Sequence, residues 1–215
     1  MLCAAKKNVL PLRPNEHSIG SAAMDHISDK KKAIFESMLA LVKENGFHGT
    51  PMSMVARKAG VAAGTIYHYF ESKEQLISEL SCLVRKQMTA AIENGADESL
   101  PFQDRFFRIW MNLYRFYENN PDALWFFEQF VNSPYNTEKE KEGHDEFHDL
   151  IFRFFRKGVD EGFFRKVNPE ILGILAHGNI ITTAKMQRYG KIAIGEAELQ
   201  QIAQMLWMGL ADHHT

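Results

Sequence analysis

The chain is poor in cysteine: its 215 residues include only Cys3 and Cys82. Two cysteines, one of them close to the N-terminus, do not supply the disulfide framework of a small secreted protein. The chain also lacks any run of about 18 apolar residues, which a membrane-spanning helix would need. Its first residues do not show a charged segment followed by an apolar one, the pattern of an export signal. We therefore expect a cytoplasmic protein without a membrane span.

Strand patterns are missing as well, because apolar residues nowhere alternate with a period of two and no hairpin turn or internal repeat occurs. Apolar residues recur instead at helical spacing, which predicts about nine helices and an all-α fold. Residues typical of helix starts mark the beginnings of some of these helices. Examples are Thr50 before Pro51, and Ser72 three residues before Gln75. The predicted helices cover about residues 29–45, 51–59, 63–70, 72–94, 102–119, 122–133, 147 to between 158 and 162, 169–187 and 196–210.

Catalytic signatures are absent too. The sequence contains no nucleophile elbow, phosphate-binding loop or dinucleotide fingerprint. His144 and His148 lie four residues apart, but Asp145 follows His144 where the zincin motif has glutamate. A metal-dependent enzyme built on these histidines is the least favoured interpretation. We predict that the protein is not an enzyme and holds neither a metal nor a cofactor.

Charge is distributed unevenly along the chain, although the total is only −2. Residues 28–95 carry 9 Lys and Arg against 7 Asp and Glu, whereas residues 96–215 carry 13 against 18. A break at residues 94–101 separates the two parts, and aromatic residues become frequent beyond it. Residues 1–27 lack periodicity and are predicted to be a flexible tail, with Met24 a second candidate start of translation. We expect an N-terminal three-helix domain over 28–95 and a C-terminal helical domain over 96–215.

Two short predicted helices flank a turn at residues 60–61 and together form a helix-turn-helix motif over residues 51–70. On the second helix, Ile66 and Phe70 fall on one side. That side must pack inward, so the opposite side, which carries His68, is presented to solvent. In a helix-turn-helix the second helix enters the major groove of DNA. The motif therefore favours DNA binding in spite of the net negative charge.

Several short motifs occur in order along this region. They are Ala56, Ala59-Gly60-Val61, Gly64-Thr65-Ile66-Tyr67, Tyr69-Phe70 and Lys73-Glu74-Gln75-Leu76. Residues 32–80, which contain them, resemble the DNA-binding domain of the TetR family of bacterial transcriptional regulators. The DNA contacts that this resemblance implies are Ala63, Gly64, Thr65, Tyr67, Tyr69 and Lys73. We add His68 from the face of its helix, and Thr50 and Ser53 as candidates at the start of the preceding helix.

The predicted recognition helix carries no Arg, Asn or Gln, the side chains best suited to bidentate base reading. We therefore expect much of the sequence specificity to come from van der Waals contacts and DNA shape. The resemblance also implies a homodimer formed by the last two helices. Residues 171–184 support this prediction independently, because they carry no charge and include the small residues Gly173, Ala176, Gly178 and Ala184.

By the same resemblance, aromatic residues of the C-terminal domain are expected to line a pocket for a small apolar or aromatic effector. The candidates are Phe107, Trp110, Tyr114, Trp125, Phe126, Phe130, Phe154 and His177. Aromatic stripes on helices also form ordinary cores, so a filled core stays open as the alternative for each of them.

Two functions are compatible with these patterns. The preferred one is a dimeric repressor that binds a palindromic operator in double-stranded DNA and is released by a small-molecule effector. The other is a DNA-bound adaptor or nucleoid-associated protein on the same scaffold, which acts through a protein partner without a small-molecule ligand. A packed C-terminal domain without a cavity, together with many dispersed DNA sites, would favour the second.

Overall fold

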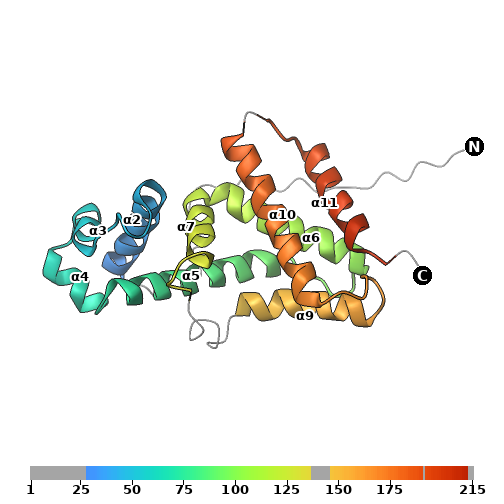
Figure 1. Ribbon diagram of the computed structural model, residues 1–215, viewed down its shortest axis with the longest axis horizontal. Helices are drawn as coiled ribbons and strands as arrows, with labels where there is room; N and C mark the ends of the chain where they lie inside the picture. The colour runs from blue at the N-terminus through green and yellow to red at the C-terminus, as the bar shows by residue number, and fades with distance from the viewer. Residues whose placement is uncertain (1–27, 137–145, 191, 213–215) are drawn as a thin grey trace, which may run out of the picture.

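The computed structural model describes residues 28–136, 146–190 and 192–212, and the predicted tail over residues 1–27 lies outside them (Figure 1). The described residues form nine helices and no strand beyond one isolated bridge between Phe164 and Ala211. The predicted all-α fold is therefore confirmed. The helices are α2 (Asp29–Asn45), α3 (Met52–Lys58), α4 (Ala63–Tyr69), α5 (Lys73–Glu93), α6 (Phe102–Asn119), α7 (Pro121–Val131), α9 (Glu146–Asp160), α10 (Pro169–Tyr189) and α11 (Glu196–Leu210).

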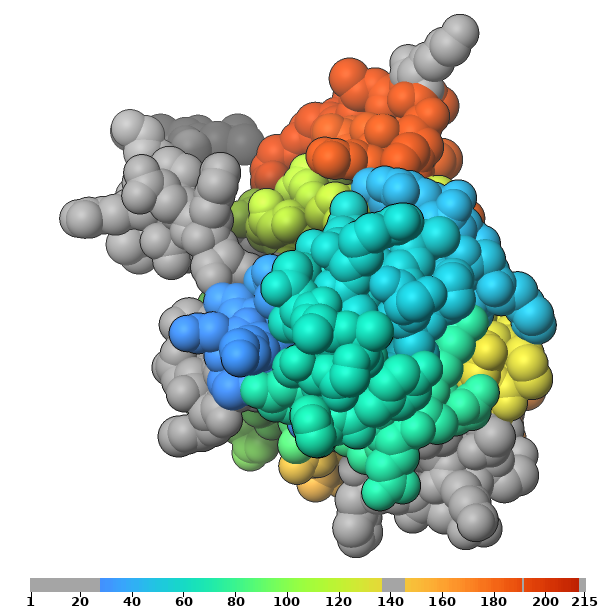
Figure 2. All heavy atoms as spheres, turned by 90° about the vertical axis from the view of Figure 1, so that its left-hand side faces the viewer, coloured from blue at the N-terminus to red at the C-terminus, as the bar shows by residue number. Residues whose placement is uncertain are grey.

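The N-terminal domain consists of α2, α3, α4 and the start of α5, folded around one small apolar core. Ile34 of α2, Val55 of α3 and Ile66 of α4 are all fully buried. Gly60 forms the turn between α3 and α4 with a φ of +68°, a left-handed conformation that favours glycine. Figure 2 looks onto this end of the molecule, where α3, α4 and the start of α5, coloured cyan to teal, form the outer surface.

The starts of α3 and α5 differ in how they are capped. The Ser72 hydroxyl accepts a hydrogen bond from the Gln75 backbone N–H at 3.2 Å, so the predicted cap of α5 is confirmed. The predicted cap of α3 is wrong: Pro51 occupies the cap position, and the Thr50 hydroxyl donates to the Gly46 carbonyl at 2.8 Å instead. The Thr50 side chain thus serves the loop that leaves α2.

Helix α5 runs from the N-terminal domain into the rest of the molecule, which we call the body (the second half of α5 through α11) (Figure 1). Its second half packs against α6 and α9. Helix α6 lies at the centre of the body, where it contacts α5, α7, α10 and α11. This position follows from its sequence, since a helix that is apolar over most of its circumference must be surrounded. Trp110 and Tyr114 of α6 are accordingly buried.

The N-terminal domain is held against the body mainly by contacts between α2 and α7. Phe47, just after α2, packs edge-on against Phe126 of α7, with 5.5 Å between the ring centroids. The Gln129 side-chain amide donates to a backbone carbonyl of α2 at 3.1 Å. Lys43 and Asp122 add an exposed ion pair at 2.8 Å, which contributes little to stability. The aromatic contact and the amide hydrogen bond therefore set the orientation of the N-terminal domain.

Candidate nucleic-acid and effector sites

The outer side of α4 is the exposed surface of the helix-turn-helix (Figure 2). The Tyr67 side chain is 56% exposed, although it is large and partly apolar. Thr65 is half-buried, and Ile66 on the inner side is fully buried. The other exposed residues of this surface are Ala63, Gly64 and His68. The structure thus brings the predicted recognition residues together on one solvent-facing side.

Gly64 has no packing reason to be glycine. A Cβ atom built on it meets no other atom within 4 Å, and its backbone is not in the left-handed region. The missing side chain therefore leaves the backbone of α4 open to close approach from outside the protein. A contact between a backbone N–H and a phosphate group needs such an approach.

Tyr69 and Lys73, two further predicted contacts, also have roles inside the domain. Tyr69 is half-buried, and its hydroxyl accepts a hydrogen bond from the Ser28 hydroxyl at 3.4 Å. The Lys73 ammonium donates to the Phe47 carbonyl, and burial lowers the pKa of this lysine. Both side chains therefore hold α4 and the start of α5 in place, in addition to lying at the predicted interface.

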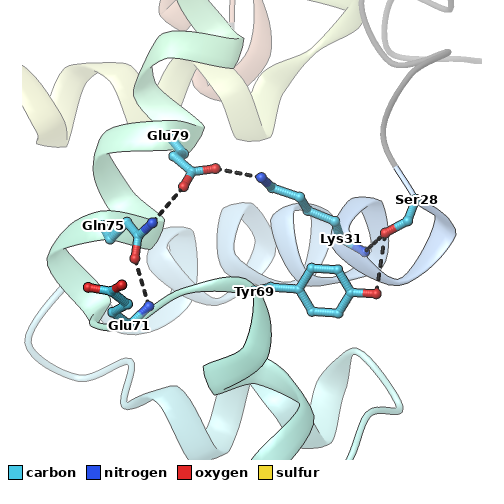
Figure 3. Close-up of polar contacts among 6 residues, drawn as sticks. All are labelled: Ser28, Lys31, Tyr69, Glu71, Gln75 and Glu79. Atoms are coloured by element: carbon cyan, nitrogen blue, oxygen red, sulfur yellow. Dashed lines mark hydrogen bonds and ion pairs between the residues drawn. The ribbon is translucent and has the colours of Figure 1, made fainter.

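A series of polar contacts fixes the C-terminal end of α4 (Figure 3). The Glu71 backbone N–H donates to Gln75 Oε1 at 2.7 Å. Gln75 Nε2 donates to Glu79 Oε1 at 3.0 Å, and Lys31 Nζ pairs with Glu79 Oε2 at 2.6 Å. The Lys31 ammonium also lies 5.2 Å from the centre of the Phe70 ring. These contacts connect α2 with α5 around the end of α4 and hold the angle of the recognition helix.

The two DNA-contact candidates at the start of the preceding helix, Thr50 and Ser53, differ in their exposure to solvent. Thr50 is 0% exposed, so the prediction that its side chain contacts DNA is wrong. Ser53 is exposed near the start of α3, and Arg57 is exposed one turn later on the same side of that helix. The sequence reasoning missed Arg57, although its spacing of four residues from Ser53 was an available signal.

The eight residues predicted to line an effector pocket do not surround one cavity. Those packed in the core are Tyr114, Phe126 and Phe130. Those that border a void are Trp110, Phe154 and His177, but its volume of about 20 Å³ has room for little more than one water molecule. Phe107 lies in an open groove between α6 and α11, and Trp125 in another between α7 and the loop after α2. The prediction of a single pocket from this set is therefore wrong.

His177 is the most polar member of that set. Its Nε2 atom lies 2.7 Å from the Tyr117 hydroxyl, and phenylalanine rings of α7 and α9 surround it. Burial lowers the pKa of His177 to about 4, so its ring is neutral near pH 7. Nearby, Trp110 Nε1 donates to Asn179 Oδ1 at 2.9 Å. The sequence reasoning missed Tyr117 and Asn179, whose hydrogen bonds connect α6 with α10.

A larger cavity of about 370 Å³ lies between the end of α5, the start of α6 and α9. Its size falls within the range of about 300–1,000 Å³ that is common for small-molecule sites. Its apolar lining is Ile92, Ala96, Ile109, Leu150 and Phe154. Its charged lining is Arg105, Arg108, Arg153 and Lys157 together with Glu93, Asp97 and Glu98. Of these residues only Phe154 was predicted from the sequence, because the cavity forms where two consecutive helices, α5 and α6, meet α9 from later in the chain.

An exposed apolar surface covers one side of α10 and α11. Ile174 is 66% exposed and Met205 is 64% exposed, and Ile171, Leu175 and Met208 lie exposed beside them. A Cβ atom on Gly178 would meet nothing within 4 Å. Not every small residue of α10 faces this way: Gly173, Ala176 and Ala184 are buried within the subunit. Isolated exposed apolar residues are common, but several large ones on two helices that contact each other indicate an interaction surface.

The described residues also bear on membrane insertion and metal binding. Within the described ranges, no helix is long and apolar enough to cross a bilayer. The same residues contain no group of three or more side chains that could hold a metal ion. His148 is exposed and its ring lies 3.8 Å from that of Phe152, whereas His144 lies outside the described residues.

Comparisons with known proteins agree with this architecture. A family profile described as "Bacterial regulatory proteins, tetR family" matches residues 34–80, and one described as "Tetracyclin repressor-like, C-terminal domain" matches residues 101–211, more than half of the chain. An uncharacterised HTH-type transcriptional regulator of Haemophilus influenzae is 25% identical over 183 residues, which cover 85% of this chain and 96% of the relative.

Solved structures show the same fold. A TetR-family transcription regulator from Marinobacter aquaeolei has a TM-score of 0.81 at 21% identity, covering 88% of this chain and 99% of its own. A TetR-family transcriptional regulator from Haemophilus influenzae has a TM-score of 0.73 at 24% identity, covering 86% of this chain and 98% of its own.

Proposed function

The chain belongs to the TetR family of bacterial regulatory proteins and is a DNA-binding transcriptional regulator. From this we propose that the protein is a dimeric repressor, which a small-molecule effector releases from a palindromic operator. The observation that carries the proposal is the outer side of α4, where Tyr67, His68 and the open backbone at Gly64 face solvent on a helix whose other side is fixed in the core. The site of action would be the cytoplasm, where bacterial DNA lies.

In the proposed complex, α4 lies in the major groove. Thr65, Tyr67 and His68 contact base edges and phosphates, and the backbone at Gly64 approaches a phosphate. Ser53 and Arg57 of α3 follow the neighbouring phosphate backbone. The excess of only two positive charges over residues 28–95 means that affinity depends on these placed contacts, and it should still fall as salt rises.

The exposed apolar surface of α10 and α11 supports a homodimer through these two helices. Association would remove Ile174, Leu175 and Met205 from water, at about 25 cal/mol for each Å² of apolar surface buried. A two-fold dimer presents two copies of α4 to one face of the duplex. The operator half-sites would then lie about 34–36 Å apart, or a multiple of this distance.

The contact between α2 and α7 supports release by an effector. Phe126 of α7 packs against Phe47 of the N-terminal domain, and it stacks on Phe130 one turn later in the same helix, with ring centroids 6.1 Å apart. A ligand that binds better when α7 is displaced would shift the population away from the DNA-bound arrangement. We place this ligand in the cavity of about 370 Å³, because the aromatic residues predicted for the role are largely packed together.

The filled aromatic core favours a second candidate function. The void beside Trp110 and His177 is only about 20 Å³, as expected for a scaffold that needs no ligand in its core. Such a protein would bind DNA as an adaptor and act through a protein partner. Many dispersed binding sites, and operator affinity that no small molecule changes, would distinguish it from a ligand-released repressor.

Selection of bound sequences from random double-stranded DNA tests the proposed function. We expect an inverted repeat whose half-site centres lie about one helical turn apart or a multiple of it. The variant Tyr67→Ala, which keeps the core residue Ile66, should enrich no such repeat. Recovery of no preferred sequence by the wild-type protein at a salt concentration near 150 mM would overturn the proposal.

A further inference from the structure

The cavity between α5, α6 and α9 combines an apolar floor with arginine side chains that form no ion pair with a carboxylate of the described residues. From this combination we propose that it binds an anionic amphiphile, a molecule with a carboxylate or phosphate head and an apolar chain or ring. The inference rests on the proposed function, because it names the chemical class of ligand for the effector site. Binding itself can be tested separately from any effect on DNA.

Arg105 is the residue that indicates the anionic head. It is half-buried on α6, and its guanidinium carbon lies 5.8 Å from the centre of the Phe154 ring and 5.9 Å from that of Phe102. Its guanidinium group makes no ion pair or hydrogen bond with any residue that the structure describes. A guanidinium held against aromatic surface keeps its N–H donors available and offers a planar pair of them to a carboxylate or phosphate.

Two further cations reach the same cavity from α9. Arg153 uses only its Nε atom, which donates to the Asp149 carbonyl one turn earlier at 3.2 Å. Its terminal nitrogens therefore remain available for a ligand. Lys157 lies one turn further along α9. Its Nζ atom is 3.8 Å from Oε1 of Glu161, and this exposed ion pair contributes little to stability. An anion bound near Arg105 would thus meet a second and a third positive charge without breaking a strong ion pair.

The acidic residues at this cavity lie further toward the solvent than the arginines beside the floor. Glu93, Asp97 and Glu98 are all exposed, whereas Arg105 and Arg108 are half-buried. The Asp97 carboxylate already accepts two hydrogen bonds from a neighbouring serine, and these lower its pKa. Arg153 and Lys157 are exposed as well, so the half-buried charges of this cavity, Arg105 and Arg108, are both positive. This arrangement fits a ligand whose apolar part covers the floor while its anionic head meets Arg105.

The apolar floor of the cavity determines what the apolar part of the ligand must be. Ile92 of α5, Ile109 of α6, and Leu150 and Phe154 of α9 meet there from three helices. A free phosphate or a short carboxylic acid would leave this surface exposed to water and would gain only the polar contacts. Each methylene group of a longer chain adds about 0.8 kcal/mol when it is fully buried, which is roughly a fourfold gain in affinity. The ligand is therefore expected to carry a chain or ring of several carbons.

Calorimetric titration of the full-length protein with four probes of eight carbon atoms each tests the inference. The probes are octanoate, octyl phosphate, octan-1-ol and octylamine. We expect octanoate or octyl phosphate to bind at least about tenfold more tightly than octan-1-ol, since hydrogen bonds to charged groups are the stronger ones, and octylamine to bind most weakly. The ratio between octanoate and octyl phosphate distinguishes a carboxylate site from a phosphate site.

Substitutions locate the site. Arg105→Gln should weaken binding of the preferred anion about tenfold and leave octan-1-ol binding unchanged, and Arg153→Gln should act in the same direction. The matched control is Lys86→Gln, which removes one positive charge from an exposed position of α5 outside the cavity and should change nothing. Melting curves show whether each variant is folded.

Several results would overturn the inference. These are no binding of either anion at millimolar concentration, octylamine binding as tightly as octanoate, or unchanged anion binding in both arginine variants. A different result separates this inference from the proposed function. If octanoate binds and Arg105→Gln weakens it, but operator affinity does not respond to octanoate, the ligand class stands and release by this ligand is refuted.

Discussion

Replacement of Gly64 by alanine should change stability and DNA binding in opposite directions. The added Cβ atom has no other atom within 4 Å and the backbone is helical, so the substitution costs nothing in packing. Alanine is about 1 kcal/mol better than glycine inside a helix, and somewhat less near a helix start such as this one. Gly64→Ala is therefore expected to raise the free energy of unfolding by about 0.5 kcal/mol.

The same methyl group stands on the surface that we assign to DNA. If it prevents one backbone N–H from reaching a phosphate, the loss is about 1.5 kcal/mol, or roughly tenfold in affinity for each half-site. Denaturant unfolding measures the first effect, and fluorescence anisotropy with a selected operator at fixed salt measures the second. Operator affinity within about twofold of wild type, in a variant that is as stable or more stable, would refute the assignment of Gly64 to the interface.

Three other predictions test the dimer, the core and the pKa of His177. Ile174→Glu places a charge on the exposed surface of α10 and should convert a dimer into monomers in sedimentation equilibrium without unfolding them; a persistent dimer would contradict the assigned surface. Gly158→Ala should destabilise the protein by about 1–3 kcal/mol in thermal melts, because its Cβ would clash with the Phe164 ring and lie 2.8 Å from the Phe102 ring. The pKa of His177 is lowered to about 4, so folding favours the neutral ring: stability should be full above about pH 6.5 and fall as pH drops toward 4, by about 2 kcal/mol between pH 7 and pH 5. His177→Asn should remove that part of the pH dependence, and an unchanged pH slope would contradict it.

The helices and their inner sides could be predicted from the sequence because local signals agree with tertiary packing. Ile66 and Phe70 share one side of a short helix, and both are fully buried in the structure. Ser72 was predicted to cap the start of α5, and its hydroxyl accepts the hydrogen bond that forms this cap. At such positions periodicity and capping leave one arrangement that buries apolar groups and satisfies the backbone.

Thr50 and Lys73 show contacts that local sequence patterns do not predict. Both were assigned by position along the chain, yet each side chain bonds to a carbonyl in the loop after α2: Thr50 to Gly46, and Lys73 to Phe47. For Lys73 this partner is distant in the sequence, and no local pattern reports it. A polar side chain near a turn has several carbonyl groups that could accept its hydrogen bond. The tertiary structure determines which of these carbonyl groups lies within hydrogen-bond distance.

The predicted lining of the effector pocket differs from the structure for another reason. Periodicity identified Trp110 and Tyr114 as inward-facing, which is correct, but it reports burial and cannot distinguish a filled core from a lined pocket. The cavity that exists depends on how α5, α6 and α9 meet. Arg105 and Arg153 have ordinary surface patterns in the sequence, and only their shared position on that cavity indicates a binding role.

Site-specific crosslinking from position 67 tests the central claim, that the outer side of α4 contacts operator DNA, most directly. A photoreactive phenylalanine analogue would replace Tyr67, with the same replacement at Phe163 as the control, an exposed aromatic residue of the segment between α9 and α10. We predict covalent attachment to a selected operator duplex from position 67 and none from position 163. Equal crosslinking from the two positions, or none from position 67 under conditions where the operator is bound, would contradict the account.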